Sequence, residues 1–241
     1  MPSIFRTITW NCQGAFRKKA SVLLTSAIPD ILVVSECEDI EHLRFPENNT
    51  RLPTTSLWFG ENPHKGLGIF SYTGMDISVA DCYDADIRFC VPLIVQAERK
   101  LHLLAVWATT GPEFSYIYQA LKASRVYQRF LEERETLVMG DFNANRQWDH
   151  LPDKTPFMDT VENLNRNGLV SVYHTLKKEA FGEESCPTFY LARNIKRPFH
   201  IDYVFAPSTW RRNILTFEVG KYSDWRSFSD HCPLFVEFTN L

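Results

Sequence analysis

The stretch FSDHCPLFVEF, residues 228–238, joins a polar segment directly to an apolar one. From Pro233 onward the residues are apolar except for Glu237, which predicts a buried β-strand. Immediately before this strand stand Asp230 and His231, a carboxylate beside an imidazole. Because strand ends present side chains to a cleft from a rigid scaffold, this pair marks a candidate site.

Strand-like runs recur along the whole chain of 241 residues. They predict strands at Ile4–Trp10, Ile31–Ser35, Ser56–Phe59, Leu67–Tyr72, Ile77–Cys82, Phe89–Gln96, Leu101–Ala108, Thr136–Phe142, Leu169–His174, His200–Phe205, Ile214–Val219 and Pro233–Phe238. Apolar residues at helical spacing predict helices over Phe16–Ala27, Ser115–Arg134 and, more briefly, Met158–Asn167. Many strands with few helices favour two sheets packed face to face with helices outside. No repeat or long linker appears, so we expect residues 1–241 to form one domain.

The composition is that of an ordinary globular protein, with 44% hydrophobic residues and a net charge of −3. This charge is no signature of polyelectrolyte binding, although a local basic groove can still bind nucleic acid. We find no secretory signal in MPSIFRTITW and no apolar run near the length of a membrane span. The six cysteines form no CxxC pair, which favours reduced thiols. We therefore expect a cytoplasmic monomer that makes no contact with a membrane.

Five predicted strands carry polar residues of catalytic type at or near one end. The segments are TITWNCQG with Asn11, PDILVVSECE with Glu36, TLVMGDFNAN with Asp141 and Asn143, HIDYVFAP with Asp202, and SDHCPLFVEF with Asp230 and His231. Singly, most have an ordinary explanation, such as a turn residue for Asn11. Asp202 resists such an explanation, because a carboxylate inside an apolar strand needs a partner. Together they indicate one site assembled from several strand ends.

On these residues the sequence resembles the endonuclease/exonuclease/phosphatase superfamily. This group includes exonuclease III-type repair enzymes, DNase I-like nucleases, sphingomyelinases and inositol-polyphosphate phosphatases. The matching segments TWNCQG, PDILVVSECE, GLGIFS, GDFNAN, HIDYVF and SDHCPL run from Thr9 to Leu234. The resemblance implies an α/β fold, a four-layered α/β sandwich of two packed mixed β-sheets flanked by helices. It also implies an active site at one end of the two sheets.

A metal site is the first role that the resemblance implies. Glu36 matches the principal Mg²⁺ ligand of the family, with Asn11 and Asp230 beside it. Mg²⁺ prefers oxygen ligands and keeps several waters, so one or two carboxylates and a substrate phosphate suffice to hold it. Such an ion polarises a phosphoryl oxygen and neutralises a leaving group. We expect Mn²⁺ to substitute for Mg²⁺.

The resemblance also implies the catalytic residues. Asp141 and Asn143 match the pair that orients the attacking water and contacts the scissile phosphate. His231 matches the catalytic histidine, and Asp202 the carboxylate that holds it. Such an Asp–His pair fixes the imidazole tautomer and stabilises its protonated form.

The segment after the predicted strand Leu101–Ala108 departs from the family. Repair-type members carry Y-x-P-N there and many phosphatase or sphingomyelinase types carry T-H, whereas this chain reads WATT at residues 107–110. The tyrosine or histidine contact to the phosphate therefore has no match, and the subfamily stays open.

Basic and aromatic residues near the motif loops are candidate substrate contacts. Arg193 and Lys196 precede the HIDY segment, and Lys65 precedes GLGIF. Trp148 and Trp225 lie close in sequence to the Asp141 and Asp230 motifs and are candidates for stacking on a base or sugar. Solvated charge for the cations and core packing for the tryptophans are the alternatives.

The leading interpretation is a Mg²⁺- or Mn²⁺-dependent phosphodiesterase or nuclease. It would hydrolyse nucleic acid or a nucleotide-like diester by in-line attack of water. A phosphomonoesterase acting on an inositol- or sugar-phosphate is the alternative. An inactive binding module on the same fold is a remote third, since all seven motif residues are present.

Overall fold

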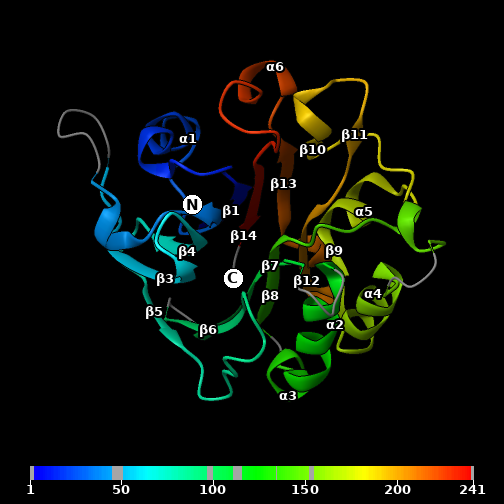
Figure 1. The fold of residues 1–241 in the computed structure, drawn as a ribbon. Coiled ribbons are helices and arrows are strands. Elements are labelled where there is room, and N and C mark those ends of the chain that lie inside the picture. The colour runs from blue at the N-terminus through cyan, green and yellow to red at the C-terminus, as the bar shows by residue number, and fades with distance from the viewer. Residues whose placement is uncertain are drawn as a thin grey trace.

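The computed structural model describes residues 3–44, 51–96, 100–110, 116–133, 135–151 and 155–239. Two six-stranded sheets lie face to face (Figure 1). The first has the order β13-β14-β1-β2-β4-β3, with β1 at Ile4–Asn11, β2 at Ile31–Cys37, β3 at Thr55–Asn62, β4 at Lys65–Ser71, β13 at Ile214–Val219 and β14 at Leu234–Thr239. The second has the order β5-β6-β7-β8-β12-β9, with β5 at Asp76–Val79, β6 at Cys90–Gln96, β7 at Lys100–Trp107, β8 at Thr136–Asp141, β9 at Leu169–Ser171 and β12 at Asp202–Pro207. Both sheets are mixed, because β1–β2 and β7–β8 are parallel and the other pairs antiparallel.

Helices from the first and second thirds of the chain flank the two sheets on their outer faces, and the last helix lies at one end of the sheets (Figure 1). Their bounds are Ala20–Ser26 for α1, Tyr116–Val126 for α2, Gln128–Leu131 for α3, Phe157–Arg166 for α4, Val172–Lys177 for α5 and Tyr222–Trp225 for α6. A two-stranded ribbon, β10 at Phe189–Tyr190 and β11 at Pro198–Phe199, lies near α6. None of the described helices is long and apolar enough to cross a membrane.

Three apolar clusters define four layers. The largest lies between the sheets, where Val33 and Ile69 of the first sheet pack with Leu103 and Met139 of the second. Outside the first sheet, Leu23 and other residues of α1 pack on β1 and β2. Outside the second sheet, residues of α2 and α4 pack on β7, β8 and β12. The expected four-layered α/β sandwich is confirmed.

A close approach of β7 and β8 places Asp141 at its strand end. The two strands are parallel, and Trp107 lies in register with Asp141. Gly140, with φ +147°, lies so close to β7 that a Cβ atom would be 1.8 Å from the carbonyl oxygen of Val106. A side chain at position 140 would therefore separate the two strands at the residue that leads into the site.

Several predicted boundaries are wrong for local reasons. The predicted strand Leu169–His174 is a strand only to Ser171, where the Ser171 hydroxyl accepts the His174 N–H and α5 begins. The predicted helix Phe16–Ala27 opens as a 3-10 turn, and α1 begins only at Ala20. The predicted helix Ser115–Arg134 divides into α2 and α3 at Tyr127, and its two end residues lie outside the described residues.

Candidate active site

The site lies at one end of the two packed sheets, where strand ends from the first sheet contact strand ends from the second. Asn11 ends β1 in the first sheet, and its side-chain Nδ2 donates to Asp141 Oδ2 at the end of β8 in the second, at 2.8 Å. Asp202 begins β12, directly opposite Asp141 in the antiparallel register. His231 comes just before β14. The four side chains are buried, so the two sheets together fix their positions.

His231 and Asp202 form the expected hydrogen bond. His231 Nδ1 donates to Asp202 Oδ2 at 2.9 Å. The Thr188 hydroxyl donates to the same oxygen at 2.7 Å, while it accepts the backbone N–H groups of Ile201 and Asp202. The backbones of Phe189 and His231 form an antiparallel bridge, and their rings lie 4.6 Å apart. The ribbon that starts at Phe189 therefore orients both members of the pair.

Burial and neighbouring charges shift the pKa values of the buried groups, and for His231 the two influences act in opposite directions. Burial alone would lower the pKa of His231, but the Asp202 and Asp141 carboxylates outweigh it and raise the pKa to about 9. Burial raises the pKa of Asp141 to about 7, with a further rise from Asp202 and a smaller lowering by His231. The neighbouring carboxylates therefore favour the protonated imidazole, and burial makes the Asp141 carboxyl less acidic than usual.

Asn143 holds Asp141 from the other side. Its backbone N–H donates to Asp141 Oδ1 at 2.8 Å, and its Nδ2 donates to Asp141 Oδ2 at 3.0 Å and to the Ala108 carbonyl at 2.9 Å. The backbone of Asn143 is left-handed, with φ +47°. Strained positions of this kind persist where the surrounding structure over-determines them, and they concentrate at functional sites.

Glu36 occupies a second strained position. Its φ is +58°, and the pairing of β2 with β4 shifts register between Ser35 and Cys37. Such a bulge re-aims a side chain at a strand end. Glu36 Oε1 lies 3.2 Å from Lys65 Nζ and 3.4 Å from Asn11 Nδ2. Asn11 thus links Glu36 to Asp141, while its own Oδ1 accepts the Gln13 N–H.

Two sets of donors could hold a divalent cation. One is the buried cluster of Asp141, Asp202 and His231, whose ligand atoms lie within 4.8 Å of one another. Asp202 Oδ1 is buried there without a hydrogen-bond partner among the described residues. The other is Glu36, a partly exposed carboxylate that already neutralises an ammonium group. A protonated imidazole cannot bind a cation, so the carboxylates of Asp141 and Asp202 in the first set, and that of Glu36 in the second, are the groups that fit a hard divalent ion.

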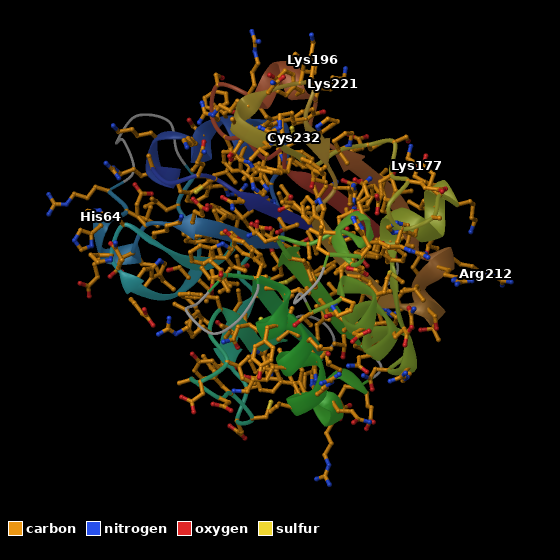
Figure 2. The ribbon with its side chains drawn as sticks, turned by 45° about the vertical axis from the view of Figure 1, so that its right-hand side comes forward. His64, Lys177, Lys196, Arg212, Lys221 and Cys232 are labelled. Carbon is orange, nitrogen blue, oxygen red and sulfur yellow. The ribbon has the colours of Figure 1, made fainter. Side chains whose placement is uncertain are left out.

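The remaining charged residues that the sequence predicts for the site are Asp230, Arg193 and Lys196. Asp230 is half-buried, and its Oδ1 accepts the Ser229 hydroxyl at 3.5 Å. Arg193 Nε donates to Gln13 Oε1 at 3.2 Å, which joins the loop after β1 to the loop after β10. Lys196 is exposed, and Figure 2 shows it at the outer end of the molecule.

The two predicted tryptophans differ in position. Trp148 is half-buried, packs 4.9 Å from the Phe199 ring and lines a small pocket together with Asn143. Trp225 is only 5% exposed and lies edge-on to Trp10 at 5.1 Å, within the core outside the first sheet. For Trp225 the structure favours the alternative of core packing, because the residue is buried among apolar side chains.

Sequence reasoning missed Thr188 and Gln13. Gln13 lies inside the TWNCQG segment, so its place beside Asn11 was open to prediction. Thr188 carries no such signal, because it reaches Asp202 across 14 residues through the β10–β11 ribbon.

Comparisons with known proteins agree with this geometry. A model of the endonuclease/exonuclease/phosphatase family matches residues 8–231. No curated protein sequence matches the chain. An AP endonuclease from Leishmania major is similar in structure, with 12% identity and a TM-score of 0.74 over 99% of this chain and 88% of that one.

Two further solved structures have the same fold. A 3′-5′ exonuclease from Neisseria meningitidis shares 18% identity, with a TM-score of 0.68 over 97% of this chain and 99% of that one. An AP endonuclease from Archaeoglobus fulgidus shares 18% identity, with a TM-score of 0.67 and the same coverage. Because the family model spans nearly all of the site-forming strands, the chain belongs to the endonuclease/exonuclease/phosphatase family.

Proposed function

We propose that this protein is a divalent-metal-dependent phosphodiesterase, with nucleic acid or a nucleotide-like diester as its substrate. The observation that carries the proposal is the hydrogen-bonded pair of His231 and Asp202 beside Asp141, which Asn11 links to Glu36. The same arrangement supports a hydrolase of phosphate esters more broadly, and the choice of a diester rests on the comparisons.

The protein's own groups divide the proton chemistry between them. Asp141, with a pKa of about 7, is suited to accept a proton from an attacking water near neutral pH. Asn11 and Asn143 hold its carboxylate in place by donating to it. His231 carries a positive charge at that pH, so its Nε2, the nitrogen that does not contact Asp202, is suited to donate to a phosphoryl oxygen.

The proposed metal ligands are Glu36, Asn11 and Asp230; Asn11 Nδ2 lies 3.4 Å from Glu36 Oε1, and Asp230 is adjacent in sequence to His231. Mg²⁺, or Mn²⁺ in its place, would polarise the phosphoryl oxygen and neutralise the leaving group there. Asp202 has a different task in this proposal: together with Thr188 it fixes the orientation of the His231 ring.

The similar structures support nucleic acid as the substrate. Two of them are described as AP endonucleases, one as a 3′-5′ exonuclease, and a Neisseria variant as a 3′ phosphatase bound to a product DNA hairpin. The six cysteines are unpaired, which supports a reducing, cytoplasmic compartment.

A substrate panel tests the proposal. Single-stranded and duplex DNA, RNA, an abasic duplex, a nucleotide diester and an inositol phosphate would each be assayed with Mg²⁺, Mn²⁺ and excess chelator. We expect metal-dependent cleavage of at least one diester, and cleavage by His231→Ala that is about 10²–10⁴ slower at the same enzyme concentration. Hydrolysis of the monoester alone would contradict the diesterase proposal, and undiminished activity in chelator would contradict the metal.

The panel also tests specificity. Because WATT at residues 107–110 carries neither family signature, we expect cleavage at an abasic site to exceed other diesters by less than about 100-fold, or about 2.7 kcal/mol of transition-state discrimination. A larger preference would show that other residues supply the missing contact.

A further inference from the structure

Register shifts in the pairing of β4 with its two neighbours, β2 and β3, bring Lys65 and Glu36 together. The register shift in β2 leaves Glu36 unpaired, and Cys37 pairs with Gly66 of β4. Lys65 is the first residue of β4 and comes directly before Gly66. The hairpin between β3 and β4 has its own register shift beside Lys65, between Gly60 and Asn62. The sheet therefore places the ammonium group and the carboxylate side by side.

The Lys65 ammonium group lies beside the Glu36 carboxylate and over the face of the Trp107 ring. Lys65 Nζ is 3.2 Å from Glu36 Oε1 and 5.7 Å from the centre of the Trp107 ring. Trp107 is in register with Asp141 and packs 4.7 Å from the Phe89 ring, so its face is a fixed platform. A cation over an aromatic face at this distance is attracted to it.

The side chain of Lys65 is also free to leave. It is 50% exposed, whereas that of Glu36 is 22% exposed. A half-exposed ion pair is weak, because water screens it and two long side chains lose rotamer freedom. Glu36 therefore has a resident counter-ion that another cation can displace.

From these contacts we propose that Lys65 competes with the divalent cation for the Glu36 carboxylate. The inference rests on the proposed metal site and adds a residue that sets its affinity. An ammonium group 3.2 Å from Oε1 and a divalent ion bound to that oxygen would repel each other at contact distance. Binding of the ion must release Lys65 from Glu36, and the cost of that release lowers the affinity for the ion.

Calorimetry with Mn²⁺ alone, on the full chain without substrate, tests the competition. Lys65→Met keeps the length of the side chain and removes its charge. We expect it to bind Mn²⁺ about three- to tenfold more tightly, the range for one exposed ion pair plus the lost repulsion. Lys65→Arg keeps the charge and should stay within about twofold of the wild-type affinity.

Lys177→Met controls for the loss of one positive charge. Lys177 lies in α5, and Figure 2 shows it on the opposite side of the molecule from His64, which precedes Lys65 in the chain. This variant should bind Mn²⁺ within about twofold of the wild type. Unchanged or weaker binding by Lys65→Met, or an equal gain in Lys177→Met, would overturn the competition.

Glu36→Gln separates this inference from the proposed function. If it loses Mn²⁺ binding while Lys65→Met is unchanged, the metal site stands and the competition fails. If it binds as tightly as the wild type, the ion lies elsewhere, and both the Glu36 metal site and the competition fail while a metal-dependent diesterase remains testable by the substrate panel. A second readout is the NMR signal of the Lys65 side chain, which we expect to shift on addition of Mg²⁺ while that of Lys177 does not. A Lys65 signal that ignores Mg²⁺ would contradict its release.

Discussion

The two halves of the site are built differently. In the inner half, Asp141, Asp202 and His231 are 0%, 1% and 4% exposed, and hydrogen bonds of 2.7–2.9 Å connect them with Thr188 and Asn11. In the outer half, Glu36 is partly exposed and contacts Lys65 and Asn11 at 3.2 and 3.4 Å.

This difference separates fixed groups from exchangeable ones. Buried polar groups interact strongly and are costly to leave unpaired, so the inner half is held in one arrangement before substrate arrives. Contacts in the outer half are weak enough to be replaced by an ion or a phosphate. Changes to the inner half should therefore alter the rate of the chemical step, and changes to the outer half should alter binding.

The largest effect is expected from the inner half. His231→Ala should lower kcat by about 10²–10⁴, the usual contribution of a positioned acid or base. Asp202→Asn should cost a similar factor, since it leaves the imidazole in the wrong tautomer and less able to hold its charge. Single-turnover rates at saturating Mg²⁺ measure both.

Two further variants make this test specific. Because His231 and Asp202 act as one unit, the double variant should be little worse than the worse single one; multiplicative losses would mean that they act independently. His174 is a matched control, because it also contacts a buried carboxylate, Glu184 Oε1 at 3.3 Å, outside the site. His174→Ala should reduce thermal stability without a comparable loss of kcat.

Glu36→Gln tests the outer half. We expect about 10- to 100-fold lower activity at low Mg²⁺, because a ligand charge is lost while the fold is kept. Raising the metal concentration should restore much of this activity. That recovery should be absent in His231→Ala, and the same metal titration on both variants makes the comparison. Equal behaviour of the two would erase the distinction between the halves.

The pH dependence of stability should reveal the buried charges. The folded-state pKa of His231, about 9, lies above the usual value of 6.5, so this group stabilises the fold fully below pH 6.5 and less as pH rises toward 9. In chelator, we expect the free energy of unfolding to fall by about 2 kcal/mol between pH 6.5 and 8.5. Urea unfolding at several pH values measures it, and His231→Gln should flatten the slope.

The smallest effect is expected at the rim. Arg193→Met should raise KM about three- to fivefold with kcat nearly unchanged, because it removes a charge that binds ground state and transition state alike. Lys196→Met, which changes another exposed cation of the same loop, should alter KM less than about twofold. A reduced kcat in Arg193→Met would place Arg193 among the groups that act in the chemical step.

The inner half was accessible from sequence because its residues end or begin strands. A carboxylate in the apolar segment HIDYVF needed a partner, and SDH supplied one; the structure joins Asp202 to His231. The two-sheet fold was predictable from local sequence as well, because runs of apolar residues mark the strands and their number indicates two sheets.

The outer half was less accessible, because it depends on register. The contact between Glu36 and Lys65 arises from shifts in the pairing of β2 with β4 and of β3 with β4, which no local pattern announces. Trp225 looked available from its position in the sequence, yet it packs against Trp10 from the other end of the chain. The short helices α5 and α6 span too few residues to show a helical period.

The close approach of Gly140 to Val106 limits which substitutions this strand can accept. At position 140 even a methyl group would strike the neighbouring strand's carbonyl oxygen, a rigid obstacle that no rotamer change can move. In a saturation library over residues 136–145, we therefore expect that no replacement of Gly140, alanine included, survives selection for folding. Gly140, the residue before Asp141, therefore limits which substitutions this segment accepts, although glycine has no reactive side chain.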